Sequence, residues 1–220
     1  MTEAASLKYL ANATRGVRSF DIQPDTDPVQ GDAPPGDPFW LAREWLPGNT
    51  DPDRPQVTLS TIDPDGFPDG RTVLMTELDD EGFFFHTDAE SRKVRDLALN
   101  PRASLVVLWP DFTRQLTVQG LAEVAPQEEI AAAYVRRSDY LKQLAWLNTA
   151  EYAQRPLEER RELWARFAAE HARYPQPASW VGFKLRPVRM TFWVSNPDAA
   201  SRRLEYRRDG DGWARTYLPG

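Results

Sequence analysis

Alternating apolar and polar positions divide much of the chain into a strand-rich stretch followed by a helix-rich stretch. The alternation predicts strands joined by Asp-, Pro- and Gly-rich turns, which are typical of hairpins, over 56–62, 70–78, 83–86, 103–109 and 115–124. A helix is expected at 90–99, and later helices at 126–137, 138–145 and 156–174, before strands return at 180–194, 204–207 and 213–217. The pattern predicts an α+β fold: a β-barrel of six to eight mostly antiparallel strands with flanking helices.

The first residues have a different character. Residues 4–13 predict a short helix, and residues 19–36 are rich in Asp, Pro and Gly. We therefore expect residues 1–36 to form an N-terminal arm or lid and residues 37–220 to form a single domain. Asp37 and Pro38 are residue types preferred at the N-cap and at the first helical position, so a helix is expected from there through Trp45.

Composition narrows the class of protein. With 220 residues, 41% of them hydrophobic, the chain suits one soluble domain with a sizeable core, and its net charge of −6 argues against nucleic-acid binding by bulk electrostatics. It has no cysteine and only two histidines, which excludes disulfides, thiolate zinc sites and multi-histidine metal sites. The beginning, MTEAASLKYL, lacks the pattern of a signal peptide, and no apolar run suits a membrane span, so we expect a cytoplasmic protein.

Three polar clusters stand at the edges of apolar segments: Arg71 to Thr76, Ser91 to Lys93, and Arg114-Gln115. Two cations in the first turn of a helix are unfavourable beside the helix dipole, and an anion there would relieve them. A guanidinium such as that of Arg71 matches two phosphate oxygens, and the amide of Gln115 can both donate and accept at a ring edge. Together the clusters favour a planar anionic ligand such as flavin mononucleotide (FMN), although each residue alone is also compatible with a solvated side chain. The pair Glu128-Glu129, by contrast, is typical of an exposed helix end.

The order of the motifs resembles that of the pyridoxamine 5′-phosphate oxidases and related FMN-binding split-barrel proteins. The matching segments are DPFWLAREW at 37–45, GRTVLM at 70–75, GFFFHTDAESRK at 82–93, NPRASLVVLW at 100–109, RQLTVQGLAE at 114–123, PASWVGFKLRP at 177–187 and TFWV at 191–194. The resemblance implies an FMN-binding split barrel that forms a homodimer with FMN at the subunit interface. It also implies oxidation of a small organic substrate by hydride transfer to FMN, with reoxidation by O₂ to H₂O₂.

The resemblance further implies which residues contact the flavin. Arg71, Arg92 and Lys93 would hold the phosphate, Gln115 would address the ring, and Trp193 and Arg203 would reach the same flavin from the other subunit. No catalytic side chain is assigned, because the cofactor carries the chemistry. The complete set implied for FMN is Arg71, Thr72, Val73, Leu74, Met75, Thr76, His86, Thr87, Arg92, Lys93, Gln115, Trp193 and Arg203.

The sequence departs from the family on the substrate side. The lysine that holds the substrate phosphate is replaced by Thr76, and of the family's tyrosine, arginine and serine only Arg137 remains, the others falling at Ala133 and Leu141. The family's Arg-x-His pair falls at Ala199 and Ser201, with Arg202 or Arg203 as shifted alternatives, and its Gln-Ser pair falls at Ala150-Glu151. Losing several charge-assisted contacts of about 1.5–3 kcal/mol each argues against pyridoxamine phosphate as the substrate.

We therefore expect an FMN-dependent oxidase with a different, less phosphorylated substrate. The expected substrate contacts are Tyr134, Arg137 and Ser201, with His86, Tyr140 and Trp146 as further candidates. Four alternatives stay open: a genuine pyridoxamine/pyridoxine 5′-phosphate oxidase, a non-catalytic flavin-binding protein, a structural dimer without flavin, and a deazaflavin in place of FMN.

Overall fold

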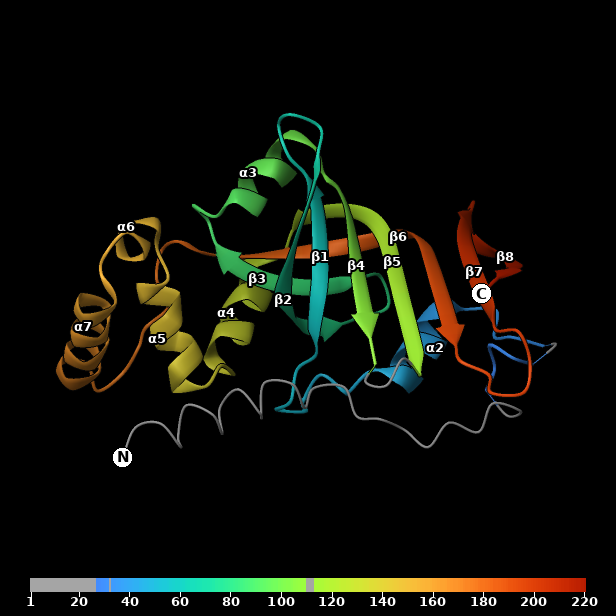
Figure 1. Ribbon diagram of the computed structural model, residues 1–220, viewed down its shortest axis with the longest axis horizontal. Helices are drawn as coiled ribbons and strands as arrows, with labels where there is room; N and C mark the ends of the chain where they lie inside the picture. The colour runs from blue at the N-terminus through green and yellow to red at the C-terminus, as the bar shows by residue number, and fades with distance from the viewer. Residues whose placement is uncertain (1–26, 32, 110–112) are drawn as a thin grey trace.

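A closed antiparallel barrel forms the centre of the molecule. The computed structural model describes residues 27–31, 33–109 and 113–220, and these contain one sheet in the order β3-β2-β1-β4-β5-β6-β7-β8. A further pairing of β3 with β6 closes the first six strands into a barrel, and β7 and β8 extend the sheet beyond it (Figure 1). The strands are β1 (Gln56–Ile62), β2 (Pro68–Leu78), β3 (Phe83–Asp88), β4 (Arg102–Leu108), β5 (Arg114–Val124), β6 (Trp180–Val194), β7 (Arg202–Asp209) and β8 (Gly212–Pro219).

The helices of the described residues flank this barrel. They are α2 (Pro38–Trp45), α3 (Arg92–Leu99), α4 (Gln127–Val135), α5 (Asp139–Leu147), α6 (Ala150–Ala153) and α7 (Leu157–Glu170). In Figure 1, α3 and α2 lie at opposite ends of the barrel, α4 lies beside β3 and β6, and α5 to α7 lie further out. The expected α+β split barrel with flanking helices is confirmed.

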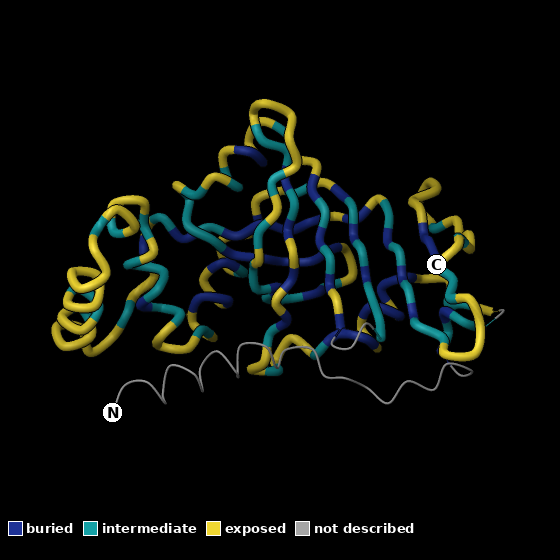
Figure 2. The backbone as a smooth tube through the Cα atoms, viewed as in Figure 1, coloured by how far each residue is buried: buried dark blue, intermediate teal, exposed yellow. Residues whose placement is uncertain are grey.

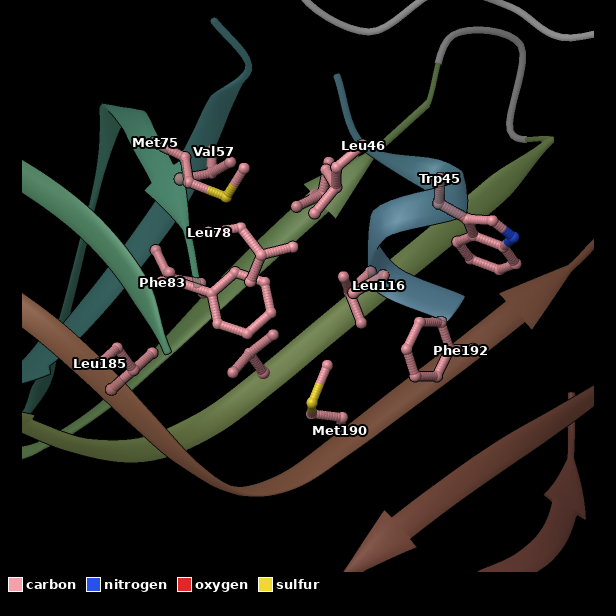
Figure 3. Close-up of a cluster of buried hydrophobic side chains, with 14 of the residues drawn as sticks. Trp45, Leu46, Val57, Met75, Leu78, Phe83, Leu116, Leu185, Met190 and Phe192 are labelled. Carbon is pink, nitrogen blue, oxygen red and sulfur yellow. The ribbon is translucent and has the colours of Figure 1, made fainter. Parts of the chain in front are cut away.

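Alternation along each strand separates the core from the outer face of the barrel. On β5, Leu116 and Val118 are fully buried, whereas Gln115 and Thr117 on the opposite face are half-buried. The core is continued at one end by α2, whose Trp45 packs edge-on against Phe192, with ring centroids 5.2 Å apart (Figure 3). The Asp37 carboxylate accepts a hydrogen bond from the Phe39 amide at 2.9 Å, as expected of the N-cap of this helix.

Strand β3 is covered on both faces. Phe83 and Phe85 belong to the barrel core, while Phe84 belongs to a second apolar cluster with Ile130, Tyr134, Ala125 and Trp180. This second cluster lies between the outer face of β3 and helix α4. His86, the next residue of β3 on that outer face, is consequently buried as well.

The observed elements differ from expectation at a few ends. Helix α3 begins at Arg92 rather than at residue 90, because the Asp88 carboxylate accepts from the Glu90 amide at 2.8 Å and holds a turn there. Helix α6 was not expected, and β7 and β8 are longer than the apolar pattern indicated. In the described residues, the outer helices α5 to α7 are largely exposed or half-exposed (Figure 2).

Part of the expected N-terminal arm packs against the sheet. Arg202 of β7 donates to the carbonyl oxygens of residues 29–31, and the Tyr206 hydroxyl donates to the Pro35 carbonyl at 2.8 Å. Asp27 is buried and forms an ion pair with Arg114 at 2.8 Å. The expected helix over 4–13 and most of the arm lie outside the described residues, so the arm or lid stays a prediction. None of the described helices is long and apolar enough to cross a membrane.

Candidate functional site

Arg71 is held in place at the end of the barrel beneath α3. Its guanidinium donates to the Thr61 hydroxyl at 2.7 Å and to the Asp69 carboxylate at 2.6 Å, and it lies 3.5 Å from Asp96. Asp96 is fully buried and also accepts from Thr61 at 2.6 Å. The guanidinium is thereby oriented before any ligand arrives, which lowers the entropic cost of binding.

The N-terminus of α3 brings the second polar cluster to the same place. The Lys93 ammonium donates to the Thr87 hydroxyl at 3.0 Å, and Arg92, which is mostly exposed, lies 3.6 Å from Asp69. Burial, and secondarily the nearby Arg71 charge, lowers the pKa of Lys93. The first turn of α3 has no acidic residue, and the Ser91 N-cap makes no side-chain capping bond. These features together make an electropositive helix end suited to an anion.

The charges of this cluster suit a phosphate. Three cations, Arg71, Arg92 and Lys93, gather at the start of α3, where Asp88 lies near Lys93, and two further carboxylates, Asp69 and Asp96, pair with the arginines. The sequence reasoning missed these two carboxylates and Thr61. Asp69 could have been found from its position two residues before Arg71 on the same strand face, whereas Asp96 in a helix gave no such signal.

Strand alternation separates the remaining β2 residues. Val73 packs against the barrel core and Met75 is fully buried in it, so the Met75 side chain faces away from any ligand on the outer surface. Thr72 and Leu74 occupy the alternate positions and face outward. Met75 could therefore contact a ligand outside the barrel only through its backbone.

Gln115, Trp193 and Arg203 lie side by side on the outer face of three neighbouring strands. Gln115 pairs with Trp193 across β5 and β6, and Trp193 pairs with Arg203 across β6 and β7. The Gln115 amide donates to the Thr117 hydroxyl at 3.2 Å, and the Trp193 indole donates to Ser201 at 2.9 Å. The structure thus places a half-buried amide beside a large aromatic ring, an arrangement suited to a flat, hydrogen-bonding ligand.

Thr76 and His86 are joined by a hydrogen bond on the outer face. The Thr76 hydroxyl lies 3.0 Å from Nδ1 of His86, and Nε2 of His86 lies 3.0 Å from the Glu129 carboxylate. The His86 side chain is fully buried, and that of Glu129 is 15% exposed. The expectation that Glu129 lies on an exposed helix end is wrong, because α4 turns this residue toward β3 while Glu128 stays exposed.

The expected substrate residues Tyr134 of α4 and Arg137, just after α4, lie against Trp180. The Arg137 guanidinium lies over the Trp180 ring at 4.3 Å and donates to the Leu141 carbonyl at 3.1 Å. Tyr134 packs edge-on against the same ring. Its hydroxyl donates to the Pro175 carbonyl at 2.8 Å, and burial raises its pKa. The Trp146 indole donates to the same carbonyl at 2.9 Å.

Other candidates lie elsewhere. Ser201 accepts from Trp193 and so belongs with the Gln115 row, not with Arg137. Arg202, the alternative for the family's substrate-binding pair, donates to carbonyls of residues 29–31 and lies over the Tyr217 ring at 3.9 Å. Tyr140 is exposed and packs against Trp164 of α7. Ala150, Glu151 and Ala199 are exposed. The structure therefore gathers three groups: the cluster at α3, the Gln115 row, and the surroundings of Trp180.

Comparison with known proteins agrees with this architecture. The closed barrel with two added strands defines the chain as an α+β split barrel. The family model "Pyridoxamine 5'-phosphate oxidase" matches residues 49–176, and "Pyridoxine 5'-phosphate oxidase C-terminal dimerisation region" matches residues 180–219. The chain therefore belongs to the pyridoxamine 5′-phosphate oxidase family. It is an oxidoreductase of the FMN-dependent oxidase type and carries the family's C-terminal dimerisation region.

Individual relatives cover nearly the whole chain. The pyridoxine/pyridoxamine 5′-phosphate oxidase of Azorhizobium caulinodans is 38% identical over 208 residues, which are 90% of this chain and 97% of the relative. That of Bradyrhizobium sp. (strain ORS 278) is 33% identical and covers 99% of both chains. Among solved structures, PhzG from Burkholderia lata 383, in complex with tetrahydrophenazine-1-carboxylic acid, aligns with a TM-score of 0.75 and 26% identity. That alignment covers 93% of this chain and 100% of PhzG.

Proposed function

We propose that this protein is an FMN-dependent oxidase that acts on a small organic substrate other than pyridoxamine 5′-phosphate. It works as a homodimer with FMN at the subunit interface and uses dioxygen as the electron acceptor, with H₂O₂ as the product. When bound, FMN supplies the hydride acceptor for the reaction. Side chains of this protein bind the substrate, orient it and exclude water.

The residues present fit FMN. Arg71, Arg92, Lys93 and the Thr87 hydroxyl would hold the phosphate, because these three cations and this hydroxyl converge at the N-terminus of α3. Gln115 and the outward residues of β2 would face the ring. The match to the dimerisation region over 180–219, which includes Trp193 and Arg203, supports an interface on this face of the sheet.

The single observation that carries the choice of substrate is the bonding of Thr76. At the position of the family's phosphate-binding lysine, a neutral hydroxyl is bonded to a buried imidazole. Of the matched positions Thr76, Ala133, Arg137 and Leu141, one is cationic. The two negative charges of a phosphate would therefore meet only the one positive charge of Arg137, whereas the single charge of a carboxylate would be balanced by that guanidinium. The carboxylic acid bound by PhzG supports a substrate of this charge.

An absorbance spectrum tests the proposal. The purified protein is examined before and after addition of FMN and is then mixed anaerobically with pyridoxamine 5′-phosphate. We expect flavin absorbance that this compound does not bleach within the time of a turnover. A protein that binds no FMN would contradict the flavin proposal as a whole.

A genuine pyridoxamine phosphate oxidase is the second candidate, favoured by the 38% identity to a relative of that name. Rapid bleaching by pyridoxamine 5′-phosphate and recovery in air would establish it. The variant Thr76→Lys sharpens the comparison, because it restores the missing cation. If the proposal holds, T76K gains affinity for pyridoxamine 5′-phosphate, whereas Thr76→Met, a control of similar length without charge, does not.

A further inference from the structure

Thr76, His86 and Glu129 form a continuous chain of hydrogen-bonding groups from three elements, β2, β3 and α4. Both links are 3.0 Å long, and they use the two different ring nitrogens of His86. The ring is held flat against Trp180 at a centroid separation of 5.5 Å and an interplanar angle of 8°. Ring orientation is therefore set by three separate contacts, more than burial of an imidazole requires.

Thr76 and Glu129 are the two partly exposed members of the chain, and Thr76 is the one that lies on β2. It is half-buried, whereas the His86 side chain is fully buried behind it. It also stands at a bulge, because Met75 pairs with Phe85 while Glu77 pairs with Phe84, which leaves Thr76 as the extra residue. Bulges occur beside active sites, where they redirect a side chain. Here the hydroxyl is turned toward both the Phe84 carbonyl, at 3.2 Å, and His86.

These two acceptors allow the chain to exist in two states that differ by one proton. In the first state the hydroxyl donates to Nδ1 of a neutral imidazole, and Nε2–H donates to the Glu129 carboxylate. In the second state the hydroxyl donates to the Phe84 carbonyl, Nδ1–H donates to the hydroxyl oxygen, and Nε2–H still donates to Glu129. The second state contains an imidazolium paired with a carboxylate. The Thr76 hydroxyl, both ring nitrogens of His86 and one carboxylate oxygen of Glu129 keep a partner in both states, while the second oxygen of Glu129 is buried without one.

The charged groups around His86 leave Glu129 as its counter-ion. On β2, Glu77 is paired with Arg136, and on α3 Lys93 donates to Thr87. Arg137 lies over Trp180, and Lys184 of β6 donates to Asp79 and Glu81. Among the described residues, Glu129 is the charged group in hydrogen-bond contact with the imidazole, and an imidazolium there is stabilised by it.

We propose that the hydrogen-bonded chain of Thr76, His86 and Glu129 is the proton acceptor for the substrate. The argument rests on the proposed function, since it places the substrate against the outer face of β2. A substrate O–H or N–H on the carbon being oxidised breaks as its proton passes to the Thr76 oxygen, while the former Thr76 proton passes to Nδ1. The hydrogen-bonded chain thereby moves from its first state to its second. The C–H bond of the same carbon breaks, its hydrogen and two electrons go as hydride to the oxidant of the proposed reaction, and a C=N or C=O bond forms in the product. Thr76 is the catalytic residue, and His86 and Glu129 are positioning residues that hold the proton.

A proton acceptor at Thr76 also restricts which substrates can react. The substrate must carry an exchangeable proton on the heteroatom of the oxidised C–N or C–O bond, as in an amine, a ring N–H or an alcohol. A substrate oxidised at a C–C bond alone would have no proton to give to the hydroxyl. Together with Arg137, this indicates a carboxylate-bearing amine or alcohol.

Nitrogen NMR of the histidines tests the chain without any substrate. The sequence contains two histidines, so ¹⁵N-histidine labelling gives two imidazole spin systems, and His171→Gln on the exposed end of α7 assigns them. In the protein without substrate we expect His86 to carry its proton on Nε2, beside the Glu129 carboxylate, with Nδ1 accepting from Thr76. Glu129→Gln should change the Nε2 shift of His86, because the carboxylate that accepts from this nitrogen is gone. The His171 signals serve as the internal reference in the Glu129 variant.

Thr76 variants separate proton transfer from simple packing. Thr76→Val keeps the shape but removes the hydroxyl, and should change the Nδ1 shift of His86, whereas Thr76→Ser should preserve it. With any donor that bleaches the flavin, T76V should lower kcat by about 10²- to 10⁴-fold with unchanged flavin absorbance, and T76S should restore most of it. A His86 proton found on Nδ1 in place of Nε2, or an Nδ1 shift unaffected by T76V, would overturn the hydrogen-bonded chain. Absence of flavin binding, in contrast, would overturn the proposed function and leave the NMR result standing.

Discussion

Gly182 of β6 leaves the space that the imidazole of His86 occupies on β3. A Cβ atom built at Gly182 would lie 2.6 Å from both Cδ2 and Nε2 of His86, and 2.9 Å from Ile130. The two residues are direct partners in the β3–β6 pairing that closes the barrel. The glycine is therefore required by the buried histidine and not by a backbone turn.

The variant Gly182→Ala should destabilise the protein, because the added methyl group overlaps the imidazole and an Ile130 side chain at the barrel seam. We expect a loss of roughly 1–3 kcal/mol in the free energy of unfolding, measured by urea denaturation. Gly36→Ala is the matched control, since a Cβ there meets nothing within 4 Å. Equal stability of the two variants would mean that His86 can move aside.

Lys93 should make FMN binding weaken at alkaline pH. Its pKa is lowered, chiefly by burial, so in the apoprotein it loses its charge below the ordinary value of 10.5. We expect the affinity for FMN, followed by quenching of flavin fluorescence, to fall as the pH rises through this window. Lys93→Arg should remove the pH dependence, and Lys93→Met should weaken binding about 10- to 100-fold at neutral pH. The same alkaline loss in K93R would assign it to another group.

Tyr206 should contribute stability that disappears in alkali. Burial raises its pKa from 10.0 to about 12, so the folded state holds the phenol proton more tightly than the unfolded state does. The contribution is therefore complete below pH 10 and is lost as the pH rises from about 10 to about 12. Urea unfolding at pH 9, 10 and 11 should show a shallower decline in Tyr206→Phe than in the unsubstituted protein. Parallel declines would contradict the assignment.

The outer face of the sheet should be the dimer interface. Val106 is half-buried there, between Thr58 and Thr117 on the neighbouring strands, and both neighbours face outward with it. Val106→Glu would place a charge against the partner, so we expect monomers by sedimentation velocity, together with weaker FMN retention. Leu157→Glu on the exposed face of α7 introduces the same charge elsewhere and should leave the dimer intact. A dimeric V106E protein would locate the interface on another surface.

Local patterns predicted the strands and the α3 cluster well, for a physical reason. The bounds of β1 and β6 follow directly from alternation and turn residues, and Lys93 was found at a helix start because a misplaced charge is visible in sequence. Strand β3 has no alternation, because α4 covers the face that would otherwise be polar. Its existence was evident from its turns, but its burial on both sides was not.

Long-range partners explain what the sequence did not reveal. Glu129 lies 43 positions from His86 and sits in a helix turn that looks solvated, so nothing local marks it as the partner of a buried imidazole. For Arg202 the sequence suggested a functional role where the structure shows a structural one. Its charge suggested a ligand contact, whereas the structure has it donate to carbonyls of residues 29–31, more than 170 positions away.

The α3 cluster has a consequence for the order of folding. Arg71, Thr87, Lys93 and Asp96 all come from one stretch of the chain, in which two strands and a short helix follow each other through tight turns. The β3–β6 seam, by contrast, joins positions about 100 residues apart, and contacts of such separation form late because their loop-closure entropy is large. A phosphate-bearing ligand would thus bind to the α3 cluster while β6 is still unpaired. Binding of the cofactor would then precede closure of the barrel and favour it.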